Sequence, residues 1–238
     1  MCGRYMMTAP VEAIRRLFDV AESPNLPPRY NIAPTQDAAV VRRAADGRRE
    51  LAMLRWGLVP PWAGDPTVGS RMINARSETA ATRPAFRDAF RSRRCLVPAD
   101  GFYEWTQEGG RKQPWLVRLP GGALYAFAGL WERWKPEGGG EAVETFTVLT
   151  TDASERLRPL HPRMPVIMAP EDYETWLSGD PAAAQDLLHP WAGPVETVRV
   201  APRVNSPRFD DADCIRPLVE EKPGTPAEEG NPGQMRLL

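Results

Sequence analysis

The 26 prolines of this 238-residue chain constrain its fold most, because they are spread along the whole sequence rather than gathered in one linker. Proline lacks a backbone N–H and is poorly tolerated inside helices and central strands. The segments between prolines are correspondingly short. Short segments separated by prolines are typical of a loop-rich protein built mainly from short strands.

The segments between the prolines predict many strands and few helices. Apolar spacing predicts a helix at residues 11–18, and a first-turn proline predicts another at 84–91. Asp46-Gly47, between residues 38–43 and 50–56, is a strong hairpin signal. Further strands are expected at 95–97, 101–105, 113–118, 123–130, 145–150, 164–168 and 195–200. One or two helical turns are expected at 154–160, and helices at 171–177 and 182–188.

This pattern predicts an α+β, β-dominated fold: a curled antiparallel sheet or partly open barrel with short peripheral helices. No shift of composition marks a domain boundary, so we expect one domain over residues 1–220. The last residues are rich in Pro, Gly and Glu and have no apolar periodicity. They predict a disordered tail over residues 221–238.

Several function classes are excluded by what the sequence lacks. The apolar runs are too short to span a bilayer, and the first residues contain no apolar signal segment, so we expect no membrane contact. Three cysteines without a CxxC pair argue against a disulfide scaffold or zinc ribbon and favour a reducing, cytoplasmic location. No nucleotide-binding or metal-binding motif is present, so we expect no cofactor and no metal.

Charge is distributed unevenly along the chain, although the net charge is only −1. Residues 1–118 contain 19 Lys and Arg against 12 Asp and Glu, whereas residues 119–238 contain 11 against 19. Nearly all of the cations are arginines, which suit bidentate phosphate contacts. The amino-terminal half therefore predicts a local anion-binding face, unless the arginines reflect only a compositional bias.

Cys2 is the most distinctive candidate for chemistry. A small second residue usually permits removal of Met1, and the mature chain then begins with cysteine. Its α-amine has a pKa of about 7.7–8.0 and its thiol a pKa of about 8.5. The two groups together convert an aldehyde into an imine and then a five-membered thiazolidine, while the thiol alone can attack an acyl group. The alternative is a small structural residue at a chain end.

Asn74 and Arg76 are two residues apart on an extended segment, so they point to the same face. An amide and a guanidinium on one surface can hold a phosphate or orient a nucleophile. The alternative is a turn asparagine followed by a solvated arginine and by Ser77 as a helix cap.

Glu104 and His161 are the candidate acid–base residues. Glu104 lies between aromatic residues in an expected strand, and apolar surroundings raise the pKa of a carboxyl group. The alternative is that Glu104 faces solvent, because successive side chains of a strand point to opposite faces and Glu104 would then lie opposite its aromatic neighbours. His161 is one of two histidines and lies among prolines that stiffen its backbone, whereas His189 follows an expected helix and suits a cap or surface position.

These segments, in this order, resemble the SOS-response-associated peptidase (SRAP) family. The matching motifs are residues 2–5, 30–35, 56–60, 74–78, 94–105, 161–165, and 204–217 near the carboxyl end. The last of them departs from the family pattern, because Asp210 and Asp211 stand where many members have an Asn-rich or basic turn.

The resemblance implies covalent capture of abasic sites in single-stranded DNA by a protein of curled β fold. It implies that Cys2 forms the thiazolidine with the ring-opened sugar and that Asn74 positions the Cys2 amine and the sugar. It also implies that Glu104 is the acid and base. His161 would protonate the sugar ring oxygen or assist reversal of the link.

The DNA-binding residues are also taken from the resemblance. Arg4, Arg76 and Arg163 would bind the phosphates that flank the lesion. Pro34 and Trp62 would pack against the neighbouring bases, although aromatic residues are more often part of the core. The expected partner is a single strand that contains an abasic site, including junctions with duplex, bound by a monomer that joins the nucleoid when on DNA.

Two other functions remain open. The thiol of Cys2, with His161 as base, also suits a cysteine peptidase that acts on proteins or removes its own Met1. A lyase-type cut through the imine is a further side activity. The arginines and aromatic residues of the amino-terminal half suit a non-catalytic reader of single strands.

Overall fold

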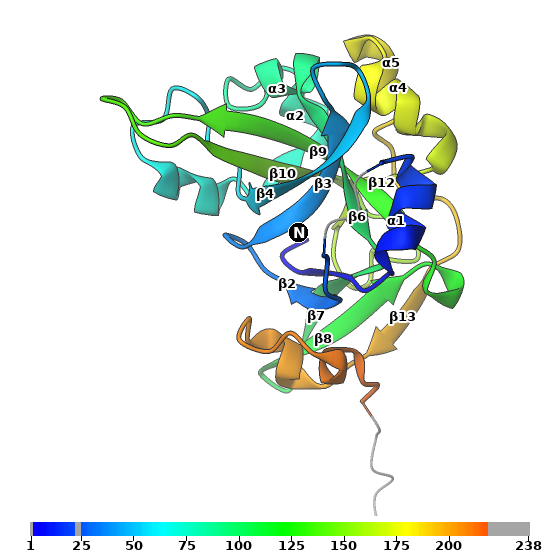
Figure 1. The fold of residues 1–238 in the computed structure, drawn as a ribbon. Helices are drawn as coiled ribbons and strands as arrows, with labels where there is room; N and C mark the ends of the chain where they lie inside the picture. The colour runs from blue at the N-terminus through cyan, green and yellow to red at the C-terminus, as the bar shows by residue number, and fades with distance from the viewer. Residues whose placement is uncertain (1, 22–24, 219–238) are drawn as a thin grey trace, which may run out of the picture.

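The computed structural model describes residues 2–21 and 25–218, which form two β-sheets with short helices around them (Figure 1). The first sheet is open and antiparallel. Its strands, in spatial order, are β13 (Glu196–Arg199), β8 (Arg111–Arg118), β7 (Gly101–Glu108), β1 (Tyr5–Met7) and β2 (Arg29–Ile32). The tail expected at residues 221–238 lies outside the described residues.

The second sheet closes into a five-stranded barrel. Its strands, in spatial order, are β10 (Val143–Asp152), β4 (Arg49–Trp56), β3 (Asp37–Arg43), β6 (Arg94–Ala99) and β9 (Tyr125–Trp134). The β9–β10 pairing closes the ring. The short strands β5 (Asn74–Arg76) and β11 (Arg163–Pro165) add to β10, and β12 (Ile167–Met168) adds to β9. The predicted β-dominated fold with a curled sheet or barrel is confirmed.

The helices are short, as the proline content predicts. The α-helices are α1 (Val11–Phe18), α2 (Ser77–Ala80), α3 (Arg87–Ser92), α4 (Tyr173–Ser178) and α5 (Pro181–Asp186). The 3₁₀ segments are Pro66–Arg71, Pro120–Gly122, Pro170–Asp172, Pro202–Asn205 and Ala212–Ile215. Four of these five begin with proline, whose missing N–H costs nothing at a first helical position. Within the described residues, none of the helices is long and apolar enough to cross a membrane.

Strand β1 joins the open sheet to the barrel and thereby fixes the position of the residues before it. Tyr5 pairs with Ile32 of β2 on one side and with Phe102 of β7 on the other. Its ring packs edge-on against Trp56 and Phe127 of the barrel, with centroids 5.2 and 5.9 Å away. The chain from Cys2 onward is consequently held inside the fold.

The predicted hairpin at Asp46-Gly47 is confirmed. Arg43 of β3 pairs with Arg49 of β4, and the Ala44 amide donates to the Arg48 carbonyl oxygen at 2.8 Å. Gly47 has a φ of +83°, which a residue without a β-carbon adopts without strain.

Residues 154–160 form the expected helical turns, since the Arg158 amide donates to the Ser154 carbonyl oxygen at 2.9 Å. Two predicted elements differ in the structure. Helix α3 begins at Arg87, because residues 84–86 form a turn in front of it. The strand expected at 164–168 is divided at Val166, whose amide donates to Leu149 of β10 and whose carbonyl accepts from Ala128 of β9.

Residues 202–217 form a strap across one face of the open sheet. The buried Asn31 side chain fastens it, because Nδ2 donates to the carbonyl oxygens of Val204, Ser206 and Phe209 at 3.2, 3.0 and 2.7 Å. Asp210 accepts from the backbone amides of Tyr30 and Asn31 at 2.5 and 2.8 Å. This acidic departure from the family pattern therefore has a role in anchoring the strap.

Arg94 stabilises the junction between α3, α4 and the barrel, although its side chain is buried. Its guanidinium donates to the carbonyl oxygens of Phe90, Trp176 and Gly179. We expect Arg94→Met to lower the free energy of unfolding by about 3 kcal/mol, because several buried carbonyl groups lose a charged donor. Urea denaturation measures this loss. Arg91→Met, on an exposed position of α3, should change stability by less than about 0.5 kcal/mol; equal effects would contradict the interpretation.

Candidate active site

Cys2 lies fully buried immediately before β1. Its thiol donates to the Arg4 carbonyl oxygen with Sγ 3.8 Å away. Burial raises the pKa of the thiol well above its ordinary value, and the nearby Glu104 carboxylate raises it further. The thiol is therefore protonated at neutral pH, unlike the low-pKa thiolate of a typical reactive cysteine. Its reaction requires a strong electrophile formed next to it, or a base that accepts its proton.

Asn74 is in direct contact with Cys2. Strand β5 places it beside Val148 of β10, and its Nδ2 donates to the Cys2 carbonyl oxygen at 2.8 Å. The Oδ1 atom of Asn74 is buried and accepts no hydrogen bond from the described residues. A buried acceptor without a partner is rare. This oxygen is well suited to accept from an amine or from a substrate hydroxyl at Cys2.

Glu104 lies on β7, the strand that pairs with β1. The Tyr103 amide donates to the Arg4 carbonyl oxygen at 3.0 Å, so the antiparallel register continues toward Cys2 and Glu104. Glu104 is 4% exposed, and burial raises its pKa to about 7. The interpretation as an outward-facing residue is wrong, because the strap covers the Tyr103 face of β7. A carboxyl group with this pKa can both accept and donate a proton near neutrality.

His161 lies in the turn before β11, which pairs with β10, and β10 pairs with β5 as well. Its Nδ1 is 2.9 Å from the Arg163 amide nitrogen and 3.1 Å from the Arg163 carbonyl oxygen. The neutral ring can accept from the first and the protonated ring can donate to the second. Partial burial lowers the pKa of the imidazole. The ring is therefore neutral at neutral pH and is oriented by the backbone.

Arg163 and Arg76 differ in how available they are to a phosphate. Arg163 donates to both carboxylate oxygens of Glu78 at 2.6 and 3.0 Å and to Asp152 at 2.8 Å. Arg76 is exposed on β5 and forms no side-chain hydrogen bond or ion pair with the described residues. Arg76 can bind an anion as it stands, whereas Arg163 must first release a carboxylate.

Arg4 is tied to the strap. Its Nη1 donates to Asn31 Oδ1 at 3.0 Å and to the Val204 carbonyl oxygen at 2.8 Å. Partial burial lowers the pKa of the guanidinium. The side chain therefore fixes the backbone two residues beyond Cys2, and any phosphate contact would use its remaining donors.

Trp62 and Asn74 line the same hollow, which has a volume of about 330 Å³. Trp62 is 65% exposed, so its ring presents an open stacking surface. Arg71 and Arg83 also line this hollow and were not singled out from the sequence. The basic charge of the amino-terminal half was the only signal that pointed to them. An aromatic face next to two cations is the combination that binds bases and phosphates of single strands.

A second hollow, of about 270 Å³, reaches Gly3, the residue after Cys2. Trp105 and Lys112 line it, and the Trp105 Nε1 donates to Asn205 Oδ1 of the strap at 2.6 Å. Pro34 is half-buried in the turn after β2, next to Thr35, which has a strained φ of +71°. The first hollow thus reaches Asn74, which bonds to Cys2, and the second reaches Gly3, the residue after Cys2. Within the described residues, no group of three His, Cys, Asp or Glu side chains is placed to hold a metal ion.

The chain resembles proteins of known name. The sequence profile of the SOS response associated peptidase (SRAP) family matches residues 1–207. Abasic site processing protein YoaM of Bacillus subtilis is 39% identical over 223 residues, which cover 90% of this chain and 97% of YoaM. Abasic site processing protein HMCES of Gallus gallus is 33% identical over 224 residues, which cover 80% of this chain and 66% of that protein.

Two crystal structures share the fold. One, of a protein from Bordetella bronchiseptica, has a TM-score of 0.72 at 30% identity and covers 84% of this chain and 100% of its own. The other, from Bacteroides thetaiotaomicron, has a TM-score of 0.81 at 24% identity and covers 92% of this chain and 100% of its own. With the family profile matched over residues 1–207, the chain belongs to the SOS response associated peptidase (SRAP) family.

Proposed function

We propose that this chain processes abasic sites in single-stranded DNA by bonding to them covalently through Cys2, once Met1 has been removed. The contact between the Asn74 amide and the Cys2 carbonyl, beside the buried Glu104 carboxyl group, carries the proposal. The names of the relatives support an abasic site as the substrate. Met1 lies outside the described residues.

The reaction would proceed through two bonds to one carbon. The Cys2 amine attacks the aldehyde carbon of the ring-opened sugar, and loss of one water gives an imine. The thiol then adds to the imine carbon, and its proton passes to the imine nitrogen, which closes a thiazolidine. The protonated thiol of the buried Cys2 fits this order, because the imine is the strong electrophile that it requires.

Each remaining side chain has one task in this scheme. Glu104 takes a proton from the amine and returns it to the departing hydroxyl, and at its pKa of about 7 both forms are populated near neutral pH. Asn74 Oδ1 accepts a hydrogen bond from the amine. His161, which is neutral at neutral pH, first takes up a proton from solvent and then donates it to the sugar ring oxygen, which opens the ring.

The two hollows suit a strand that passes Cys2 in extended form. An exposed tryptophan in the first hollow stacks only with bases that are not paired, which favours a single strand or its junction with duplex. Arg76, Arg71 and Lys112 would contact its phosphates. Pro34 would pack against a base. We expect the protein to act as a monomer.

Intact mass spectrometry before and after incubation with an abasic single strand tests the proposal. The expected result is a starting mass without Met1, followed by a gain equal to the oligonucleotide less one water. A starting mass that retains Met1, together with no adduct, would rule out aminothiol chemistry. Equal, non-covalent binding of intact and abasic strands would instead support a non-catalytic protein that binds single strands.

A general cysteine peptidase fits the site less well, because the pKa of the Cys2 thiol is raised rather than lowered. Self-removal of Met1 is a narrower possibility that uses Glu104 beside the scissile bond. Retention of Met1 in a Glu104→Gln protein, against its loss from the wild type, would support self-processing.

Glu78 should compete with DNA for Arg163. Because both of its oxygens accept from that guanidinium, we expect Glu78→Gln to leave Asp152 as the one carboxylate partner of Arg163 and to tighten binding of an intact single strand severalfold. One additional phosphate contact should steepen the slope of log K against log salt by about 0.7. Fluorescence anisotropy over a salt series measures both changes. Glu141→Gln, an exposed change outside the hollows, is the control. Weaker binding by Glu78→Gln would show that the pair is only structural.

A further inference from the structure

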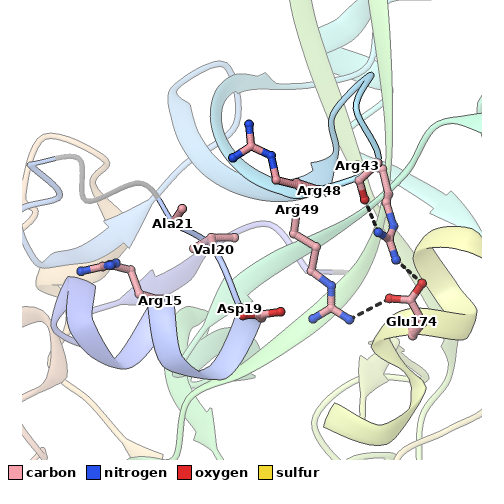
Figure 2. Close-up of a pocket in the computed structure, with 9 residues that line it drawn as sticks. Arg15, Asp19, Val20, Ala21, Arg43, Arg48, Arg49 and Glu174 are labelled. Carbon is pink, nitrogen blue, oxygen red and sulfur yellow. Dashed lines mark hydrogen bonds and ion pairs between the residues drawn. The ribbon is translucent and has the colours of Figure 1, made fainter.

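A hollow of about 690 Å³ lies between α1, the β3–β4 hairpin and α4 (Figure 2). Its lining includes four arginines from two segments of the chain: Arg15, Arg43, Arg48 and Arg49. None of the residues that line the two hollows at Cys2 lines this one. The basic charge of the amino-terminal half therefore gathers in a second place, apart from the candidate active site.

Two of these arginines form the fixed inner part of the hollow. Arg49 donates to the Phe18 carbonyl oxygen at 3.1 Å and to Glu174 at 3.0 Å, and Arg43 donates to the other oxygen of Glu174 and to Ser178. One carboxylate is thus shared by two guanidinium groups, as Figure 2 shows. The shared pairing leaves one positive charge at this point uncompensated.

The other two arginines stand at the rim. Arg15 is exposed on α1 and forms no side-chain hydrogen bond or ion pair with the described residues. Arg48 is 77% exposed and pairs with Asp46 in the hairpin turn. Figure 2 shows both guanidinium groups directed away from Glu174. Asp19 is the only other carboxylate in the lining, so with Asp46, which pairs with Arg48 from outside the lining, four cations face three anions.

The rest of the lining indicates the class of ligand. It consists of Val20, Ala21 and Gly47, without an aromatic ring or a side-chain amide. A nucleobase would find no aromatic ring to stack on and no side-chain amide to pair with there. Phosphate groups need only converging cations, which arginines supply with a fixed fork geometry.

We propose that this hollow binds the sugar–phosphate backbone of nucleic acid, without sequence preference, at a distance from the reacting residues. The proposal rests on the proposed function only in taking DNA as the partner. It makes Arg15 and Arg48 the contacts that hold strand outside the lesion, with Arg43 and Arg49 supplying fixed positive charge behind them. A strand too short to extend beyond the two hollows at Cys2 would not reach it.

The test compares wild type with Arg15→Gln/Arg48→Gln on intact single strands of about 10 and about 30 nucleotides over a salt series. Loss of two phosphate contacts should make the slope of log K against log salt for the long strand shallower by about 1.4. It should also weaken binding of the long strand severalfold. The short strand should bind equally well to both proteins. Arg91→Gln, an exposed arginine outside all three hollows, is the matched control and should behave as wild type.

Two further measurements separate the possible outcomes. Glu174→Gln removes the anion between Arg43 and Arg49 and should steepen the long-strand slope. If inorganic phosphate stabilises the protein thermally, but the double variant keeps the long-strand slope of wild type, the hollow is an anion site that does not bind DNA. That result would overturn the proposal. A third outcome separates the two proposals. If the double variant binds the long strand with a shallower salt slope, but wild type forms no adduct with abasic strands, this site is upheld and covalent capture is refuted.

Discussion

Alanine at position 2 will leave the protein able to bind an abasic strand but unable to hold it through denaturation. Cys2→Ala keeps the amine and removes the second nucleophile, so the chemistry stops at an imine that water reverses. We expect the heat-stable adduct to fall by at least about 100-fold, since thiazolidine closure is the step that traps it. Denaturing gel electrophoresis after incubation with an abasic oligonucleotide measures the yield.

Cys95→Ala is the matched control, because Cys95 is also fully buried and its thiol also has a raised pKa. Cys95→Ala should lower the free energy of unfolding by about as much as Cys2→Ala does, and it should still form the heat-stable adduct. A wild-type adduct yield from Cys2→Ala would refute the thiazolidine directly. Loss of adduct in both variants would point to damaged folding rather than to chemistry.

Glutamine at position 104 should slow adduct formation by about 100-fold, because the amide can neither accept nor return the proton. Wild type should show a change in rate near pH 7, where the buried Glu104 carboxyl group titrates, and Glu104→Gln should keep only the change that comes from the Cys2 amine at about pH 7.7–8.0. Rates from quenched time courses between about pH 5.5 and 8.5 test this. An unchanged pH profile in the variant would assign the titration to another group.

The same substitution should stabilise the fold above neutrality. Burial raises the Glu104 pKa to about 7 from an ordinary 4.5, so the native state holds the proton more tightly than the unfolded state. Between these pH values stability falls as pH rises, by about 3 kcal/mol in total. Glu104→Gln avoids this cost and should unfold at higher urea concentration than wild type at pH 8.

Glu132→Gln is the control for the stability effect. Glu132 is also a buried glutamate, but it accepts from Arg93 at 2.7 Å. Its replacement should destabilise the protein, because the half-buried Arg93 guanidinium loses its anionic partner. If Glu104→Gln also lost stability at pH 8, Glu104 would be a structural residue.

Local signals in the sequence were sufficient for many elements. Asp46-Gly47 predicts its hairpin because the turn conformation depends on those residues alone. The closure of the barrel was not predictable, since the pairing of Thr145 with both Arg55 and Glu132 depends on contacts distant in sequence. The divided strand at Val166 is similar, because the change of partner is set by neighbouring strands.

The candidate site was predicted as separate residues rather than as an arrangement. Alternation alone left Glu104 ambiguous, because β7 is covered on both faces and the rule assumes one solvated face. Arg163 was expected to bind a phosphate, but its pairing with Glu78, 85 residues away, is invisible in the local sequence. Arg71 and Arg83 gain significance only when folding brings them beside Trp62.

The strap has a consequence for how the protein is made. Arg4 bonds to Val204, 200 residues later, so the first strand leaves the ribosome long before its fastening exists. During translation the amino terminus lacks both β7 and the strap, and the Glu104 carboxyl group has not yet been enclosed. Once Met1 is removed, the Cys2 amine and thiol of the growing chain are therefore exposed at their ordinary pKa values, and cellular carbonyl compounds can react with them until β7 and the strap enclose the site.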